Sequence, residues 1–194
     1  MVSRLSFGLG PAGSREEQPG HQALSGESRP QAWLQGGTPA PPYRATSRKW
    51  YRVGFAYDSP GFIPLRDKVK ISMGFITILP SGNVNLTMWE ALSVGCLTKF
   101  YQYNTTSVPG QFIYFSTRHN MVKDVTVVET NYTEYALALK YKNFNREYMQ
   151  VALYGRSPRV RMHVMQKFKA FALSRGFPRA SILTPPPAEN CPPS

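Results

Sequence analysis

Cysteine, histidine and acidic residues are all scarce in this sequence of 194 residues. Two cysteines are too few for a disulfide-dense scaffold and for a cysteine-based structural zinc site, while one disulfide and two free thiols are both compatible with the count. A membrane-spanning helix is also missing, because the longest uncharged stretch, Ile71 to Trp89, is interrupted by the turn residues at 80–83.

The shortage of acidic residues leaves 11 Asp and Glu against 23 Lys and Arg, a net charge of +12. An excess of this size indicates an anionic partner of one of three kinds: a nucleic acid, an anionic surface or an anionic ligand. Apolar residues make up 42% of the chain and aromatic residues 13%, which excludes disorder along the whole length and predicts a sizeable core.

Residues 1–47 differ in composition from the rest of the chain. Gly and Pro together number 13 there, about 28%, and no periodic apolar pattern is present. We therefore expect a disordered N-terminal segment. The apolar stretch Leu5 to Leu9 is short and lacks the long hydrophobic region of a secretory signal peptide.

Runs of β-branched and aromatic residues, separated by turn residues, follow from Trp50 onward. Eight strands are predicted: Trp50–Tyr57, Lys68–Leu79, Val84–Leu92, Gly95–Tyr103, Gln111–Ser116, Val122–Thr130, Tyr132–Lys142 and Glu147–Tyr154. Short links favour antiparallel pairing of consecutive strands, and eight strands are the number that closes a barrel able to hold one small ligand. The sequence therefore predicts an all-β fold, an eight-stranded antiparallel up-and-down barrel.

One helix is predicted after the strands and is expected to pack on the outside of the barrel. Ser157 stands where an N-cap belongs and Pro158 at the first helical position, while Gly176 ends the helix. The apolar stripe at helical spacing consists of Val160, Val164, Phe168 and Phe171. A short strand, Ser181–Leu183, and a Pro-rich tail follow.

Three short motifs carry a resemblance to a known family: Lys49-Trp50-Tyr51, Thr130-Asn131-Tyr132 and Tyr154-Gly155-Arg156. In order and separation they resemble the three motifs of the lipocalins, over residues 48–191. The most similar branches are the lipocalin-type prostaglandin D synthases and the neutrophil gelatinase-associated lipocalins. Arg48 stands where the family has glycine, and the family's secretory start is missing, so we interpret residues 1–47 as an atypical N-terminus.

The resemblance implies a domain division and structural roles for the motif residues. Residues 48–184 would form the barrel, or calyx, with its helix, and residues 185–194 a tail tied by a disulfide. Trp50 would close the narrow end of the barrel with Arg156 packed across its indole, and Thr130 and Tyr132 would shape the turn of the second motif.

The resemblance also implies a disulfide between Cys96 and Cys191, in place of two free thiols. An oxidising compartment agrees with the Asn-x-Ser/Thr sequons, from which we predict glycosylation at Asn85 and Asn104. A third sequon, at Asn131, lies in the motif turn, where access is restricted.

A lipocalin barrel is a cup lined by alternate side chains of its strands, and the resemblance fixes which side chains point inward. The predicted ligand-binding residues are Ser72, Met88, Lys99, Tyr101, Tyr114, Lys123, Leu137, Leu139, Tyr141, Tyr148, Gln150 and Tyr154. This wall is apolar and aromatic with one or two cations, which suits a fatty acid, a retinoid or a prostanoid-like ligand with a carboxylate. Filling the barrel core is the alternative role for each of these side chains.

Enzymatic chemistry is not indicated by the residues. The position matching the thiol of the prostaglandin synthases holds Gly74, and the three histidines, at 21, 119 and 163, are scattered. We predict no catalytic residue, no metal site and no cofactor, and a variant resembling the synthase without its thiol is one alternative.

Two further alternatives concern anionic ligands. Siderophore capture in the related lipocalins uses three basic residues in the cup, but the corresponding positions look like Tyr101, Tyr141 and Gln150, none of which is basic. The predicted helix carries a basic face that could bind a heparin-like glycan or an anionic lipid surface, formed by Arg159, Arg161, Lys167, Lys169 and Arg175. Nucleic acid is not expected, because the helix aromatics belong to the apolar stripe rather than to this face.

Together these observations predict a secreted, monomeric lipocalin-like protein that binds and transports a small hydrophobic ligand outside cells and is not an enzyme.

Overall fold

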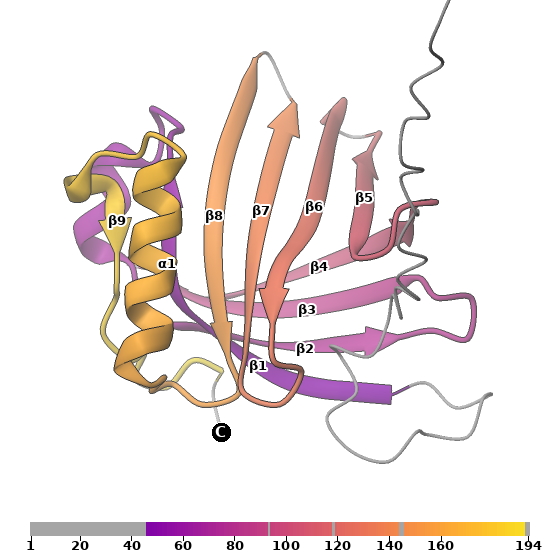
Figure 1. The fold of residues 1–194 in the computed structure, drawn as a ribbon, viewed down its shortest axis with the longest axis horizontal. Helices are drawn as coiled ribbons and strands as arrows, with labels where there is room; N and C mark the ends of the chain where they lie inside the picture. The colour runs from indigo at the N-terminus through magenta and orange to yellow at the C-terminus, as the bar shows by residue number, and fades with distance from the viewer. Residues whose placement is uncertain (1–45, 93, 118, 144–145, 193–194) are drawn as a thin grey trace, which may run out of the picture.

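The computed structural model describes residues 46–192 except 93, 118 and 144–145 (Figure 1). Most of the N-terminal segment for which we predicted disorder, residues 1–45, lies outside the described residues. Its last two residues belong to the first strand, which begins at Thr46 rather than at Trp50. Within the described ranges, the helices fall short of the length and apolarity that crossing a membrane requires.

The strands close into a single antiparallel barrel, as the sequence predicted. Their order around the sheet follows the chain from β2 to β8, then β1 and the short β9, and pairing of β1 with β2 closes the ring. The bounds are β1 Thr46–Tyr57, β2 Ser72–Ile78, β3 Val84–Leu92, β4 Gly95–Thr105, β5 Gln111–Ser116, β6 Met121–Thr130, β7 Tyr135–Asn143, β8 Glu147–Gly155 and β9 Ile182–Leu183.

Two of the eight predicted barrel strands begin later than predicted. A short 3-10 helix, η2 (Ile63–Lys68), ends at the predicted first residue of β2, and residues 69–71 form neither helix nor strand, so β2 begins at Ser72. The predicted start of β7 is instead a turn in which Tyr132 has a positive φ of 67°. There the Asn131 side-chain oxygen accepts hydrogen bonds from the backbone N–H groups of Glu134 and Tyr135, at 2.9 and 3.1 Å.

The helix α1 (Met162–Ser174) lies across the outside of β1, β7 and β8 (Figure 1). Three residues of the helix, Val164, Phe168 and Ala172, are buried against the barrel. Gly54 of β1 allows the close approach, because a β-carbon at this position would lie 2.8 Å from the Phe168 ring. Gly176, with φ of 88°, ends the helix as predicted.

The predicted start of this helix was wrong. Ser157 does not cap it: α1 begins at Met162, and Arg161 is the N-cap residue. Ser157 instead accepts a local hydrogen bond from the Arg159 N–H, at 3.3 Å. A β-carbon on Gly155 would lie 2.7 Å from Val160, so the chain leaves the barrel through a tight connection before the helix begins.

The motif residues meet at the narrow end of the barrel. The Arg156 guanidinium lies 4.8 Å from the centre of the Trp50 ring, a cation–π contact, and it donates a hydrogen bond to the Lys49 carbonyl at 2.7 Å. The Thr130 hydroxyl bonds the Tyr135 carbonyl at 2.6 Å and accepts from the Tyr132 N–H at 2.9 Å. Trp50 is buried, which leaves the opposite end of the barrel as the mouth.

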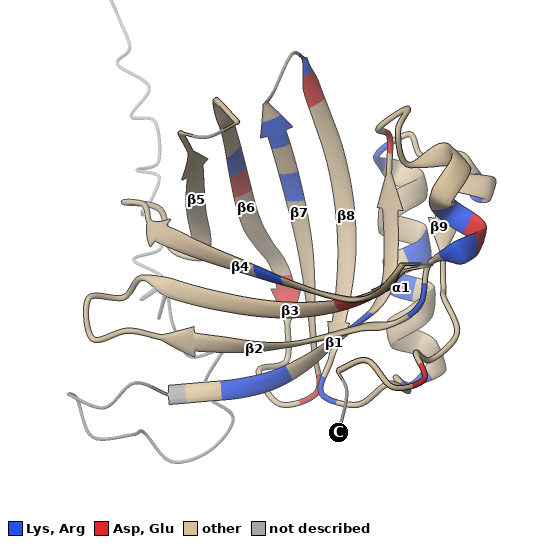
Figure 2. Cartoon of the chain, turned by 180° about the vertical axis from the view of Figure 1, so that it is seen from behind, with Lys and Arg blue, Asp and Glu red and all other residues tan. Residues whose placement is uncertain are grey.

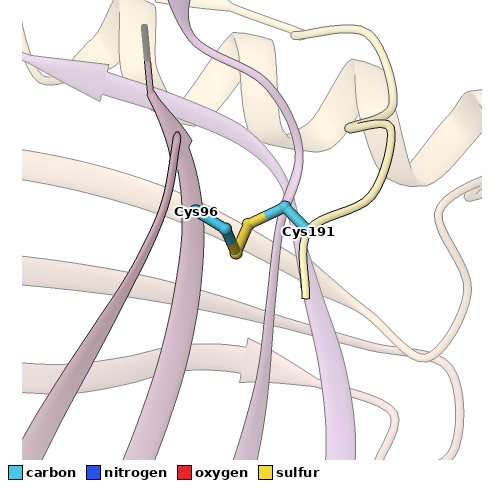
Figure 3. The surroundings of a disulfide bond; sticks show 2 residues. All are labelled: Cys96 and Cys191. Carbon is cyan, nitrogen blue, oxygen red and sulfur yellow. A yellow bond between two sulfur atoms is a disulfide. The ribbon is translucent and has the colours of Figure 1, made fainter. Parts of the chain in front are cut away.

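The predicted disulfide between Cys96 and Cys191 is confirmed (Figure 3). Its Cα atoms lie 5.3 Å apart, and it ties the start of β4 to the tail that follows the helix. The Ile71 N–H, just before β2, donates to the Pro186 carbonyl at 2.8 Å. The tail is therefore fixed to the barrel at two points.

A cationic cup as the candidate ligand site

A cavity of about 560 Å³ occupies the mouth half of the barrel, within the usual size range for small-molecule sites. Its deep part borders Phe55, Leu86, Met88 and Tyr103. Phe62 and Leu65, from the connection between β1 and β2, lie beside its mouth, where Phe62 packs against the rings of Phe55 and Tyr57 at 5.2 and 5.6 Å between centroids.

Most of the predicted site residues lie together around this cavity. The lining includes Ser72, Met88, Lys99, Tyr101, Lys123, Tyr141, Tyr148, Gln150 and Tyr154. Tyr141 also packs against the apolar cluster beneath the helix. Tyr114 borders an adjoining hollow and packs with Tyr101 and Tyr103, at ring-centroid distances of 5.3 and 5.7 Å.

Two of the three predicted inward positions of β7 were wrong. Leu137 and Leu139 do not face the cup: they pack on its outer side, in the cluster that contains Val164 and Phe168 of the helix. The inward positions are instead held by Ala136 and Ala138, followed by Lys140. From Tyr135 to Leu139, the larger side chains of this strand therefore anchor the helix, and the two alanines face the interior of the barrel.

The cup is far more basic than the predicted one or two cations. Among the described residues, its lining holds one acid, Glu90, and seven basic residues: Arg52, Lys68, Lys70, Lys99, Lys123, Lys140 and Lys142. Figure 2 shows basic positions on the neighbouring strands β6 and β7 and on β4 across the barrel. The sequence contains all of these lysines and arginines, but only the strand register shows that they share one cavity.

The Glu90 carboxylate forms ion pairs with two of these basic side chains. Arg52 donates to the Glu90 carboxylate at 3.0 Å and to the Ser72 hydroxyl at 2.8 Å, and Lys99 forms an ion pair with the other carboxylate oxygen. Burial alone would raise the pKa of Glu90, but Arg52 and Lys99 outweigh it and hold that pKa below its usual range. These two cations on one carboxylate leave a net charge of +1 in this network.

Lys123 and Lys140 have no carboxylate partner among the described residues. The Lys140 ammonium donates instead to the Tyr154 hydroxyl. The Lys123 ammonium lies over two aromatic faces, 4.2 Å from the centre of the Tyr101 ring and 5.4 Å from that of Tyr114. Burial, followed by the charges of Lys140, Lys142 and Lys99, lowers the pKa of Lys123 to about 7, although Glu90 opposes the shift.

The buried phenols of the cup are kept protonated. Burial raises the pKa of Tyr101 to about 12, with Glu90 adding to the shift, and burial also raises the pKa of Tyr103 well above its ordinary value. These tyrosines therefore offer neutral hydroxyl groups at neutral pH, and the positive charge of the cup is not offset by phenolate.

A second hollow of about 450 Å³ adjoins the cup between β4 and β5. These two strands pair only at Asn104 with Ile113 and Thr105 with Phe112, so they diverge toward the mouth. The hollow shares Lys99, Tyr101, Lys123 and Lys142 with the main cavity, which places these side chains where the two spaces meet.

The basic face on the helix is partly neutralised. Arg161 forms an ion pair with Glu134, and Lys167 forms one with Glu129. His119 borders the second hollow and His163 lies exposed on the helix. Among the described residues, no group of His, Cys, Asp and Glu is arranged to hold a metal ion.

Comparison with known proteins establishes the family. Residues 47–189 match the model of the lipocalin and cytosolic fatty-acid binding protein family, and the chain belongs to this family. It is 31% identical over 144 residues to a protein named lipocalin from Rhinella marina, covering 74% of this chain and 79% of that one. Lipocalins generally bind small hydrophobic ligands and are mostly not enzymes.

Other relatives differ in length and activity. The chain is 30% identical over 148 residues to protein AMBP from Bos taurus, covering 75% of this chain but only 42% of that longer protein. It is 31% identical over 151 residues to prostaglandin-H2 D-isomerase from Equus caballus, covering 74% and 76% of the two chains. That relative is an enzyme, whereas lipocalins as a group are typically secreted binding proteins.

Solved structures show the same barrel. The siderocalin Ex-FABP, described as functioning through dual ligand specificities, superposes with a TM-score of 0.68 at 25% identity, covering 75% of this chain and 96% of that one. Lipocalin 12 from rat epididymis gives a TM-score of 0.63 at 21% identity, covering 72% and 81% of the two chains, a likeness of fold alone.

Proposed function

We propose that this lipocalin binds and carries a small amphiphile, with an apolar chain and an anionic head, outside cells. The observation that supports this is the composition of the cup: apolar and aromatic walls combined with seven basic residues against one acid. A fatty acid, or a retinoid or prostanoid carboxylate, has the matching chemistry.

The two parts of such a ligand gain free energy from different parts of the cup. The chain gains about 25 cal/mol for each Å² of apolar surface that it buries against residues such as Phe55, Leu86 and Met88. The carboxylate supplies the counter-charge that Lys123 and Lys140 lack, and a charge-assisted hydrogen bond of this kind contributes about 1.5–3 kcal/mol.

We propose a carrier role without catalysis. The position matching the thiol of the prostaglandin synthases is Gly74, where a β-carbon would lie 2.6 Å from the Thr87 carbonyl oxygen. Packing at this point of β2 therefore excludes any larger side chain unless the backbone shifts, and both cysteines of the chain are used in the disulfide.

Displacement of a fluorescent apolar probe tests the ligand class. Decanoate should displace the probe from the wild-type protein at lower concentration than decanol, because only the acid has an anionic head. The preference should shrink in Lys123→Met and further in the double variant with Lys140→Met, while Lys169→Met, on the exposed face of the helix, serves as the matched control. Equal competition by acid and alcohol for the wild type would contradict a role for the cations.

An extracellular location predicts modification of the sequons. Asn104 is exposed at the end of β4, whereas the Asn85 side-chain oxygen is buried without a partner. Protein secreted with a supplied signal peptide should therefore carry glycan chiefly at Asn104, detected as a mass loss after treatment with peptide N-glycosidase. Secreted protein without any glycan would contradict both predicted sites.

The basic cup also favours a second candidate, a ferric catecholate siderophore, whose three negative charges and aromatic rings suit lysines set beside tyrosines. Tyr101, Tyr141 and Gln150 are not basic, but Lys140 and Lys142 lie in the cup beside them. Quenching of intrinsic fluorescence by a ferric tris-catecholate, with loss in Lys140→Met, would support this candidate. Quenching unaffected by this substitution would exclude it.

A further inference from the structure

Lys123 differs in its surroundings from the other lysines of the cup. It lies on β6, with Tyr114 of β5 and Lys142 of β7 as its cross-strand neighbours. Its side chain borders both the main cavity and the hollow between β4 and β5, and its ammonium lies over the rings of Tyr101 and Tyr114. A ligand in either space therefore reaches this nitrogen.

Burial and three lysines favour the neutral form of Lys123, while Glu90 and the rings of Tyr101 and Tyr114 favour its ammonium. Burial and the positive charges of Lys99 on β4 and of Lys140 and Lys142 on β7 lower its pKa to about 7. The opposing charge, Glu90 on β3, is engaged by Arg52 and Lys99. The tyrosines on β4 and β5 are neutral, since burial raises the pKa of Tyr101. Near neutral pH, a large fraction of Lys123 is therefore an amine with a free lone pair.

We propose that Lys123 forms a reversible imine with aldehydes that carry an apolar chain. This inference rests on the proposed function, because the chain must occupy the cup. The Nζ lone pair attacks the carbonyl carbon, the carbonyl π electrons move to oxygen, and a proton passes from nitrogen to oxygen to give a carbinolamine. Loss of water then forms the C=N bond, and addition of water reverses it, so neither oxidant nor reductant is needed.

The aromatic faces suit a protonated imine as well as the ammonium that it replaces. Protonation of the imine nitrogen restores a cation in the place of the ammonium, and the rings of Tyr101 and Tyr114 stabilise it by the same cation–π attraction. Lys99, with its carboxylate partner, and Lys140, with its hydroxyl partner, are held in other interactions. The geometry therefore favours Lys123 over these two neighbours.

Reductive trapping tests the inference. The protein is incubated with decanal and cyanoborohydride, and the adducts are located by intact mass and peptide mapping. The initial rate of decyl addition at Lys123 should exceed that at exposed Lys169 by about tenfold or more, because a larger fraction of Lys123 is unprotonated. It should also rise as the pH increases from 6 to 8. Lys123→Arg should lose the fast site, while Lys169→Arg, which removes one exposed amine, should keep it.

Probe displacement by decanol, measured in parallel, separates this inference from the proposed function. Displacement without preferential addition at Lys123 would overturn the imine while leaving the carrier role intact. Addition spread evenly over the lysines would overturn it too. If decanol and decanoate both fail to displace the probe and Lys123 is not alkylated, both proposals fail. Mapping on the wild-type protein keeps the test decisive even if Lys123→Arg does not fold.

Discussion

The two walls of the barrel are stabilised in different ways. The wall formed by β1, β7 and β8 is buried on both faces, because α1 covers its outer side through Val164 and Phe168. On the opposite wall, the outward-facing Phe100 and Phe115 are 60% and 56% exposed, and β4 and β5 pair only at one end. The wall of β1, β7 and β8 is thus stabilised by packing on both faces. The wall that contains β4 and β5 is looser: a disulfide holds the start of β4, and the second hollow opens there.

Of the proposed changes, removing the disulfide should lower the free energy of unfolding most. The local loosening should appear in the wall that contains β4 and β5. Cys96→Ser is expected to lower the free energy of unfolding by about 2–5 kcal/mol, because the bridge closes a long loop of the unfolded chain. Chemical denaturation measures the loss. Hydrogen exchange should rise most in β4 and the tail, and exchange that rises equally in β7 and β8 would contradict the difference between the walls.

Matched truncations on the two walls should differ in cost. Leu139→Ala, beneath the helix, should destabilise the protein by about 2–5 kcal/mol, because it opens a void in close packing. Met88→Ala, on β3 beside the cavity, should fall at the low end of that range, since it enlarges a space that already exists. Urea denaturation of both variants gives the comparison, and a larger cost for Met88→Ala would reverse it.

Lys123→Met should stabilise the protein in a pH-dependent way. Lys123 has a pKa of about 7 in the folded protein against an ordinary value of 10.5, so below pH 7 the wild type bears the full cost of burying the charge. Between these two values the unfolded chain binds the extra proton, and wild-type stability rises with pH. The advantage of Lys123→Met should therefore shrink by about 2–3 kcal/mol between pH 6 and pH 9.

Unfolding curves of wild type and variant at both pH values measure this difference. Lys169→Met provides the control, because it removes a lysine whose side chain is exposed on the helix. An advantage of Lys123→Met that stays constant from pH 6 to pH 9 would show that the Lys123 side chain titrates like an exposed lysine.

Sequence reasoning predicted the fold well because the local signals agreed with one another. The turn residues between strands set the strand bounds, and β3 and β5 match the prediction residue for residue. The disulfide and the contact of Arg156 with Trp50 came from the family resemblance rather than from any pattern of spacing. The prediction of the helix start failed because Gly155 and Val160 lie close together, and a capping pattern in the sequence does not reveal this packing.

The candidate site was less predictable for two physical reasons. On β7, from Tyr135 to Leu139, both faces are apolar, so a period of two does not show which face the helix covers. Arg52 and Glu90 are 38 residues apart in the sequence, and only the pairing of β1 with β2 and of β2 with β3 brings them together. The basic character of the cup depends on such long-range register.

The central claim, that the ligand binds in the cup, is tested most directly by two tryptophan substitutions at adjacent positions of β8. Gln150 lines the cavity, and Met149 packs toward the helix side of the same wall. Calorimetric titration with decanoate should show affinity reduced by about tenfold or more in Gln150→Trp, because the indole fills space that the ligand needs. Met149→Trp should bind as the wild type does. Wild-type affinity in Gln150→Trp, or a loss confined to Met149→Trp, would place the ligand outside the cup and contradict the account.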